Sequence, residues 1–230
     1  MTWTVGSAVR ATFALVRDNF SAFFVTTLVL TAPMLIADLI EGGMVVSLAL
    51  GAVSNVLTAL CLSVGTLQAM AGHRPDTAGL LRQLGRPNSG RLILLGIVQS
   101  LVIALGFTLV VPGVYVLALW MVAVPAMIVD NLSVGEALDR SSALTRDRRW
   151  RTLLAFAAVL VICVVPLTAI DYLLIWLVGG TEESVSGYFV TWLVGAVLGA
   201  VMGSLPAVLY GLLREEKEGM TVAQLATDLG

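Results

Sequence analysis

Long apolar runs follow one another along the chain and predict its architecture. A helix that crosses a bilayer needs about 20 predominantly apolar residues. The runs that reach or approach this length are 20–40, 45–71, 92–111, 113–130, 152–178 and 187–213. Only Val111, Pro112 and Gly113 join the third run to the fourth, which predicts a tight turn between two helices. The pattern predicts an all-α polytopic membrane protein, with six spans in a single integral-membrane domain over residues 1–230.

The composition excludes several other classes of protein. The chain is 58% hydrophobic and 12% charged, whereas about 25% of the residues of a soluble domain are charged. The net charge of −2 leaves no basic excess for a nucleic-acid partner. Cys61 and Cys163 lie inside apolar runs, where buried free thiols are expected rather than a disulfide framework. We therefore expect neither a cytosolic globule nor a nucleic-acid-binding protein.

Positive charge is segregated to alternate loops. All 13 Lys and Arg residues lie before the first run, between the second and third, between the fourth and fifth, or after the sixth. The loops 41–44, 111–113 and 178–187 contain none of them. Because positively charged loops stay in the cytoplasm, this predicts an even number of spans with both termini cytoplasmic. We expect the first run to be retained rather than cleaved as a signal, since no small-residue cleavage site follows it.

Amphipathic stretches lie between the spans, on the predicted cytoplasmic side. Residues 4–18, 133–148 and 221–229 each place apolar side chains at helical spacing, which predicts interfacial helices. Ser133 and Glu136 form a capping-box pattern at the start of the second stretch. These helices either contact lipid headgroups or pack on the end of the bundle. The candidate headgroup contacts are Arg10, Arg17, Arg140, Arg146, Arg148, Arg149 and Arg151.

The first amphipathic stretch recurs later in the chain. Residues 4–18 align without gaps on 133–147, with seven of fifteen positions identical. In the spans that follow, Pro33 precedes Asp38 by the same five residues that separate Pro166 from Asp171. Both copies run in the same direction, which predicts a parallel repeat about a pseudo-two-fold axis along the membrane normal. Spans one and two then correspond to spans five and six, and the hairpin of spans three and four lies between the copies.

Small residues recur at every fourth position of several spans. In the sixth span they include Gly195, Gly199, Gly203 and Gly211. Such stripes let helix backbones approach closely in lipid, where the hydrophobic drive between helices is weak. We interpret the stripe as packing within the bundle, and the alternative is a homodimer through the same face.

Few polar side chains lie within the spans. The candidate intramembrane polar site comprises Asp171, Asn55, Gln99 and Asp38. An ionised carboxylate within the bilayer is costly, so Asp171 is protonated, is hydrogen-bonded to a neighbouring helix or lines a polar cavity open to external water. Prolines at 33, 125, 166 and 206 interrupt four spans, either as packing kinks or as the broken helices that transporters use.

Enzyme signatures are lacking in the sequence. No GxSxG, HExxH, CxxC or phosphate-binding glycine loop occurs, and His73 is the sole histidine. We expect no cofactor, no metal site and no catalytic residue. An enzyme would have to rely on carboxylates such as Asp38 and Asp171, which have no visible partner in the sequence.

The stretch 111–154 resembles the membrane domain of bacterial glycerophosphoryl diester phosphodiesterases and related inner-membrane proteins. The resemblance consists of Pro-Gly-x-Tyr at 112–115, a Trp then a Pro at 120 and 125, Asp130, Ala-Leu-x-x-Ser at 137–141 and a short basic loop. The ending LYGLLREEKEGMTVAQLATDLG and the beginning TVGSAVRATFALVRDNF are also similar. Asp130 stands where the motif usually has glutamate. The phosphodiesterases carry a soluble catalytic barrel, for which we expect no room in the 17 residues after the sixth run.

The resemblance implies a six-span domain of the bacterial inner membrane, without catalytic residues to carry over. Our first hypothesis is a non-enzymatic scaffold, accessory or lipid-associated module. The alternative is a small transporter or lipid-handling permease with a polar cavity near Asp171 and Asn55. The expected partners are the phospholipid bilayer and a second copy or a larger membrane complex.

Overall fold

The structure is a computed structural model that describes residues 3–39, 44–85, 89–107, 111–181 and 184–219. Helices account for nearly all of the secondary structure, and no strand occurs in these ranges. The helices are α1 (Val5–Asp18), α2 (Phe20–Leu39), α3 (Met44–Met70), α4 (Thr77–Arg82), α5 (Ser89–Phe107), α6 (Val111–Trp120), α7 (Ala123–Asp130), α8 (Val134–Thr145), α9 (Arg149–Leu177) and α10 (Val185–Glu218), with a 3₁₀ turn η1 (Gln83–Gly85) after α4. The predicted all-α class is confirmed.

Five segments are long and apolar enough to cross a membrane. They are Phe20–Leu39, Ala49–Met70, Gly113–Asp130, Arg149–Leu177 and Val185–Glu218. The run 92–111 corresponds to α5, whose described apolar part, Gly90–Ile103, is shorter than the others. The structure therefore supports a membrane protein with several apolar helices. The number of six spans stays a prediction.

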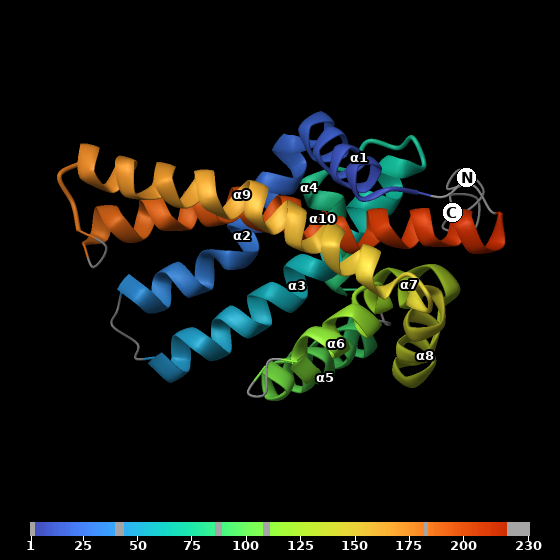
Figure 1. Ribbon diagram of the computed structural model, residues 1–230. Helices are drawn as coiled ribbons and strands as arrows, with labels where there is room; N and C mark the ends of the chain where they lie inside the picture. Colours follow the sequence, from blue (N-terminus) through green and yellow to red (C-terminus); the bar gives the residue numbers. More distant parts are fainter. Residues whose placement is uncertain (1–2, 40–43, 86–88, 108–110, 182–183, 220–230) are drawn as a thin grey trace.

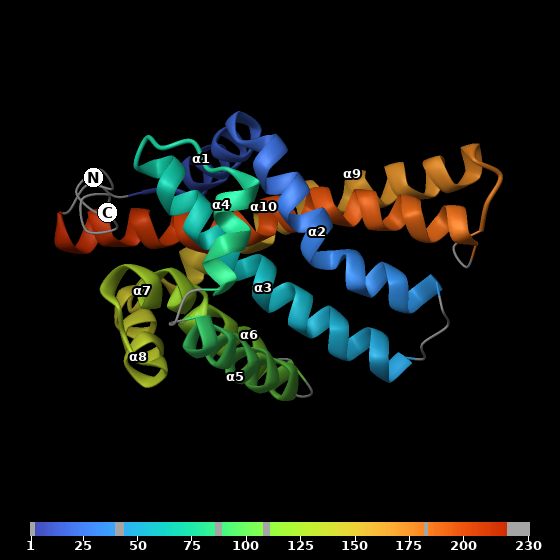
Figure 2. The same ribbon diagram turned by 180° about the vertical axis from the view of Figure 1, so that it is seen from behind.

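The long helices form three antiparallel hairpins. These are α2–α3, α5–α6 and α9–α10, and the C-terminal ends of α2, α5 and α9 lie toward the left of these helices in Figure 1. The short helices α1, α4, α7 and α8 lie toward the other end, together with the last turns of α10 (Figures 1 and 2). Helix α10 packs against α2, α3 and α9, so it forms the centre of the bundle.

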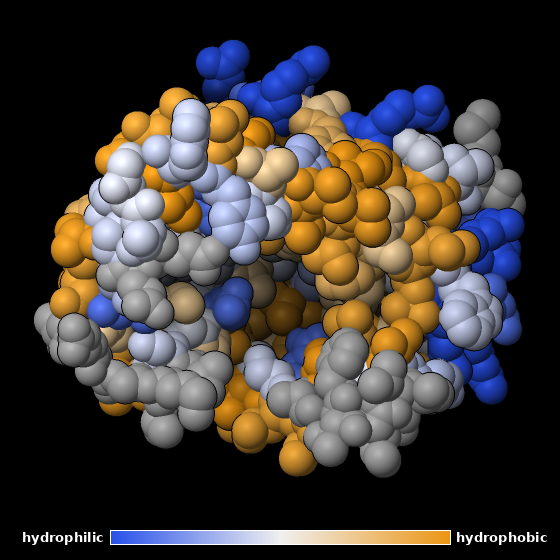
Figure 3. Space-filling view, turned by 60° about the vertical axis from the view of Figure 1, so that its left-hand side comes forward, coloured by the Kyte–Doolittle hydropathy of each residue, from blue (hydrophilic) through white to orange (hydrophobic). Residues whose placement is uncertain are grey.

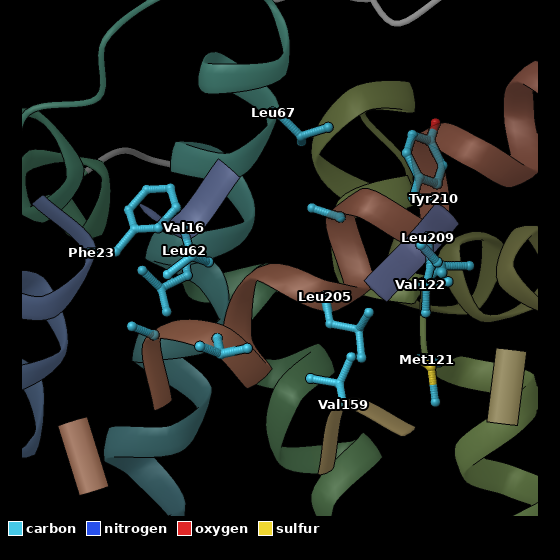
Figure 4. Packing of buried hydrophobic residues seen from close by; sticks show 14 of the residues in the cluster. Val16, Phe23, Leu62, Leu67, Met121, Val122, Val159, Leu205, Leu209 and Tyr210 are labelled. Carbon is cyan, nitrogen blue, oxygen red and sulfur yellow. The ribbon is translucent and has the colours of Figure 1, made fainter. Parts of the chain in front are cut away.

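Buried side chains of α10 organise the core. Leu205, Leu209 and Tyr210 are fully buried and extend toward α3, the α6–α7 segment and α9. Figure 4 shows them among Leu62, Met121, Val122 and Val159, side chains from distant parts of the chain. The outer face of α9 is apolar and exposed instead, since only 17% of the most hydrophobic 18-residue stretch of this helix is buried. Exposing such a surface to water would be unfavourable, which agrees with a lipid environment.

The predicted turn at Val111, Pro112 and Gly113 is wrong. These three residues form the first turn of α6, and the connection precedes them. Proline is favoured in a first helical turn because its missing N–H would have no intrahelical partner there and its φ already fits the helix. Pro112, which the sequence pattern assigns to a turn, therefore lies in the first turn of α6.

The fourth predicted span is not one continuous helix. It divides at Met121 and Val122 into α6 and α7, just before Pro125. Pro33, Pro166 and Pro206 instead lie inside α2, α9 and α10 without dividing them. Of the four interruptions predicted at prolines, the one in 113–130 is thus found just before Pro125, and those predicted at Pro33, Pro166 and Pro206 are wrong.

Candidate functional site

A ring of four alternating charges joins α7, α8 and α10. Asp130, the last residue of α7, accepts from Arg140 Nε at 3.1 Å and from Arg214 Nη1 at 2.9 Å. Glu218 accepts from Arg214 Nε at 2.8 Å and from Arg140 Nη2 at 2.5 Å. We call these four residues the charge ring. Each carboxylate contacts both guanidinium groups, so the ring has no net charge.

Local backbone geometry positions the ring. Asn131 ends α7 in the left-handed region at φ 48°, and α8 then folds back along α7 and α6. On α10, Arg214 and Glu218 are one turn apart and share a face. At 34 residues and about 1.5 Å each, α10 is longer than the hydrocarbon core is thick, so its last turns can hold charges beyond that core.

Tyr210 completes the inner side of the charge ring. Its hydroxyl accepts from Arg214 Nη1 at 2.7 Å and donates to Asp130 Oδ2 at 3.3 Å. Arg214 is only 8% exposed, and its guanidinium also lies 5.8 Å from the centre of the Tyr210 ring. Burial of the Arg140 guanidinium lowers its pKa, and the hydrogen bonds and charges of Asp130 and Glu218 raise that pKa by more. The two carboxylates therefore stabilise the charged form of Arg140.

The end of α10 also holds the start of α9. Glu216 accepts from Arg148 Nη2 at 2.9 Å, and Arg151 lies 4.0 Å from the same carboxylate. Lys217 Nζ donates to the carbonyls of Ala143 and Arg146 at 2.8 Å each. These carbonyls belong to the C-terminal end of α8, where a cation also opposes the helix dipole. The last two turns of α10 therefore bind α7, α8 and α9 together.

The break between α6 and α7 frees carbonyls that polar side chains satisfy. The Ser141 hydroxyl donates to the Leu119 carbonyl at 2.7 Å, and Gln99 Nε2 donates to the Trp120 carbonyl at 2.6 Å. A backbone carbonyl without a partner would be costly at this depth. Gln99 on α5 and Ser141 on α8 thus stabilise the interruption from two sides.

A cavity of about 360 Å³ lies where the hairpins meet. Residues from α3, α5, α6, α7, α9 and α10 line it, most of them apolar, and Asn55, Thr58, Ser63, Gln99 and Ser100 supply its polar groups. Figure 3, turned by 60° from the view of Figure 1, shows a hollow at the centre of the molecule with hydrophobic residues at its base.

The four candidate polar residues do not form one site. Asn55 and Gln99 line the cavity. Asp171 accepts from the Thr191 hydroxyl at 3.2 Å within the α9–α10 hairpin, and Asp38 accepts from the Ser47 hydroxyl at 2.9 Å within the α2–α3 hairpin. Each carboxylate thus has a hydrogen-bond donor on the partner helix of its own hairpin.

The seven candidate arginines fall into different settings. Arg140 belongs to the charge ring and Arg148 pairs with Glu216. Arg149 donates to the Tyr115 hydroxyl at 2.6 Å, with its guanidinium 5.1 Å from the ring centre. The side chains that stay exposed are those of Arg10, Arg17, Arg146 and Arg151.

Helices α1 and α8 turn one face toward the bundle. The positions 8, 12 and 16 of α1 and the aligned positions 137, 141 and 145 of α8 are all buried. Packing on the bundle, one of the two interpretations of these stretches, therefore holds for their inner faces. The third stretch, 221–229, lies outside the described residues.

The beginning of α8 is capped as its sequence predicts. Glu136 accepts from the Ser133 hydroxyl at 2.6 Å and from the Ser133 N–H at 2.8 Å. These two hydrogen bonds lower the pKa of the Glu136 carboxyl below its ordinary value. The Thr4–Ser7 capping box likewise satisfies backbone N–H groups at the beginning of α1, but it contains no carboxylate.

The surroundings of the two repeated segments differ. Helix α1 packs mainly on α9 and α10, whereas α8 packs mainly on α6 and α7. Likewise α2 contacts α10 extensively, while α6 contacts α9 on the other side. The two repeated segments therefore do not have equivalent neighbours in the bundle.

The glycine stripe of α10 packs inside the bundle over part of its length. A Cβ at Gly199 would lie 2.8 Å from Thr27 Cγ2, and one at Gly203 would lie 2.5 Å from Leu62 Cδ1. Gly211 is buried, whereas Gly195 is exposed with nothing within 4 Å of its Cβ position. Helix α10 can approach α2 and α3 this closely only with glycine at 199 and 203.

The charge ring is the feature that the sequence pattern did not predict. Asp130 was noted only as an acidic motif residue, Arg140 only as a headgroup contact, and Tyr210, Arg214 and Glu218 had no assigned role. The sequence did contain a signal for the charge ring, because positions 210, 214 and 218 recur every fourth residue on one face of a helix.

Within the described ranges, no group of three or more His, Cys, Asp or Glu side chains is arranged to hold a metal ion. Cys61 and Cys163 are buried free thiols, as predicted.

The fold and these contacts define a helical integral-membrane domain. The chain belongs to the family described as the membrane domain of glycerophosphoryl diester phosphodiesterase, whose profile matches residues 93–210, just over half of its length. The matched segment contains Gln99, the α6–α7 break, Asp130 and Arg140. It corresponds to a membrane domain, and no catalytic domain is evident in the match. No match was found among curated proteins or among solved structures.

Proposed function

We propose that this chain is a non-enzymatic, lipid-associated module of the bacterial inner membrane, with six spans and both termini in the cytoplasm. The observation that carries this proposal is the placement of positive charge. Helices α1 and α8 and the first turn of α9 lie away from the C-terminal ends of α2, α5 and α9 (Figure 1). These elements and the short segment between α8 and α9 bear the exposed Arg10, Arg17, Arg146 and Arg151. This distribution supports the cytoplasmic orientation of that end.

Aromatic side chains beside these arginines support a position at the membrane interface. Trp150, between Arg149 and Arg151 at the start of α9, is 78% exposed, and Tyr115 is 51% exposed. Tryptophan and tyrosine favour the headgroup region, where one end of the ring is apolar and the other is wet. Exposed arginines at that level attract anionic lipids by about 1 kcal/mol each.

The charge ring supports a scaffold rather than a binding site for ions. Its two guanidinium groups are satisfied by two carboxylates, so an added anion would have to displace an existing partner. Its effect is to hold α7, α8 and α10 in one arrangement. The exposed arginines are then presented to lipid from a rigid support.

The internal repeat is part of the proposal. The buried positions of α1 and α8 agree with the sequence alignment, and each helix leads directly into a proline-containing long helix, α2 or α9. We infer that an ancestral unit of surface helix and two spans was duplicated, and that the α5–α6 hairpin separates the copies.

A small transporter or lipid-handling permease is the second candidate. The central cavity favours it, because Asn55 and Gln99 line that cavity. Asp171 lies instead in the α9–α10 hairpin, where Thr191 binds it. A transport pathway through this protein would therefore use the amides rather than the carboxylate.

Lipid retention tests the lipid-associated function. The protein is extracted in native lipid particles, and mass spectrometry measures the ratio of anionic to zwitterionic phospholipid. Replacing Arg10, Arg17, Arg146 and Arg151 together by Gln is expected to lower that ratio. The matched control replaces the same four residues by Lys, which keeps the charge and is expected to keep the ratio. An unchanged ratio in the Gln variant would contradict the proposal.

A further inference from the structure

The central cavity has a lining that selects a particular kind of molecule. We propose that it holds one hydrocarbon chain of a bilayer lipid, together with an uncharged hydrogen-bonding group carried on that chain. This inference goes beyond the headgroup contacts at the arginine-bearing end. It rests on different residues, in the interior of the bundle.

The size and chemistry of the cavity fit a hydrocarbon chain. Its volume of about 360 Å³ falls within the usual range of small-ligand pockets, about 300 to 1,000 Å³. The walls are formed largely by Leu, Ile, Val, Met and Phe side chains, such as Leu60, Ile103, Phe156 and Met202. A water-filled channel for a polar solute would need more polar groups than these walls supply.

The cavity is accessible from the part of the surface that faces lipid. Asn55 on α3 and Ser100 on α5 line the cavity and are themselves exposed. Near them along the same helices, Val53 is 47% exposed and Leu101 is 59% exposed. Exposed apolar side chains thus occur on both helices close to the residues through which the cavity reaches the surface, and we infer that a chain of a neighbouring lipid enters between α3 and α5.

Two hydroxyl groups at the cavity point to a hydrogen-bonding ligand. Thr58 Oγ1 and Ser63 Oγ are both buried and have no hydrogen-bond partner within the described residues. Both residues line the cavity. A buried hydroxyl without a partner is unfavourable, and native proteins leave few of them. Neither oxygen is exposed to the cavity in this structure, so a hydroxyl or ester oxygen on the bound chain would satisfy them only after the two side chains rotate toward it.

The ligand inside the cavity is uncharged. No Asp, Glu, Lys, Arg or His is present among the described residues that line it. An ionised group would therefore lose its hydration without gaining an opposite charge. This separates the cavity from the arginine-bearing end, where the charge of a headgroup is the recognised feature.

Photocrosslinking tests whether a lipid chain occupies the cavity. The full-length protein is reconstituted in phosphatidylcholine bilayers that contain a phosphatidylcholine with a diazirine in one acyl chain. After irradiation, mass spectrometry maps the adducts. We expect adducts within 58–63 and 199–206, in addition to those on the exposed face of α9 around Val161 and Val165. Adducts on α9 without any at the cavity segments would overturn the proposal.

Cavity-filling variants provide the specificity control. Ala59→Phe on α3 and Met202→Trp on α10 add volume from two different helices of the lining, and each is expected to remove the cavity adducts while the α9 adducts persist. Ala52→Phe places the same ring at an exposed position of α3 outside the cavity lining, and is expected to change neither set. Cavity adducts that persist in both folded filling variants would also overturn the proposal.

A second comparison tests the hydrogen-bonding part. Diazirine-labelled probes of equal length, one a long-chain alcohol and the other an alkane, are added to the same bilayers. In the wild-type protein the alcohol is expected to label the cavity segments roughly fivefold more efficiently, as one hydrogen bond would give. In the Thr58→Val, Ser63→Ala double variant this preference is expected to vanish. Equal labelling by both probes in the wild type would contradict a hydrogen-bonding site.

The outcome is independent of the proposed headgroup contacts. Phosphatidylcholine carries no net charge, so loss of the exposed arginines does not affect cavity labelling. If the arginine variant alters lipid retention but the cavity segments stay unlabelled, only the cavity proposal fails. The reverse result would remove only the headgroup proposal.

Discussion

Arg214 Nη1 donates to Asp130 Oδ1 across 2.9 Å and joins the last turns of α10 to the end of α7, 84 residues earlier in the chain. Arg140 and Glu218 close this contact into the charge ring. The result is that the short helices at one end of the bundle share a single electrostatic support.

Removing Arg214 is expected to be strongly destabilising. Arg214→Ala leaves Asp130 and Glu218 facing Arg140 alone, so the free energy of unfolding should fall by about 3 kcal/mol. Thermal unfolding of the purified protein in detergent measures the change. The control is Arg17→Ala, because Arg17 pairs only with its neighbour Asp18 at a side-chain exposure of 81%, and such pairs contribute about 0 to 1 kcal/mol. Similar effects of the two substitutions would contradict the role of the charge ring.

The hydroxyl of Ser141 is expected to matter for the α6–α7 break. Ser141→Ala leaves the Leu119 carbonyl without its 2.7 Å hydrogen bond, which should cost about 1 to 3 kcal/mol of stability. Ser142→Ala is the matched control on the same helix, since no hydrogen bond of its hydroxyl holds the break. Chemical unfolding curves of both variants give the comparison. Equal stability of the two proteins would show that the break does not depend on Ser141.

Alanine substitutions at Gly203 and Gly195 of α10 are expected to change the stability of the protein in opposite directions. Gly203→Ala places a methyl group 2.5 Å from Leu62 Cδ1, so overpacking should destabilise the protein by about 1 to 3 kcal/mol. Gly195→Ala meets no atom within 4 Å and should stabilise the helix by about 0.5 to 1 kcal/mol. Differential scanning calorimetry measures both.

The exposed Gly195 also tests the homodimer alternative. If a second copy packed on this face, Gly195→Leu would lower the mass measured by light scattering in detergent. Packing within the bundle predicts the same mass for the variant and the wild type, because the contacts of Gly199 and Gly203 are intramolecular.

Acid is expected to loosen the beginning of α8. The pKa of Glu136 is lowered from 4.5 by the Ser133 hydroxyl and N–H, so its stabilising contribution is present above that value and is lost as the pH falls through the lowered one. Hydrogen exchange of the first α8 amides, corrected for intrinsic rates, should accelerate only as the pH falls below 4.5. The Thr4–Ser7 cap of α1 has no carboxylate and serves as the internal control. Parallel acceleration at both caps would contradict the assignment to Glu136.

Much of the fold could be predicted from the apolar runs, because every segment that crosses the bilayer must be predominantly apolar over about 20 residues. The runs 20–40, 45–71 and 152–178 differ by only a few residues from α2, α3 and α9. The Ser133–Glu136 cap was also predictable, since the interaction is local. The turn at Pro112 was not, because proline both ends and begins helices and the pattern contains no signal for which occurs.

The candidate site was less predictable, because it depends on which helices meet. Asp130, Arg140 and Arg214 come together only after α8 folds back and α10 crosses the bundle. Arg140 and Arg10 look alike in sequence, yet one lies in the charge ring and the other is exposed. Similarly, Asn55 and Asp171 are both polar residues in apolar runs, and only the packing of the hairpins separates their environments.

Cysteine accessibility tests the membrane arrangement most directly. After Cys61 and Cys163 are replaced by Ala, single cysteines are introduced by Gly85→Cys, in η1, and Thr181→Cys, after α9. A membrane-impermeant maleimide is applied to intact spheroplasts and to inverted vesicles. The account predicts that Thr181→Cys is labelled only in spheroplasts and Gly85→Cys only in inverted vesicles. Labelling of both positions from the same side would contradict the proposed orientation and the even number of spans.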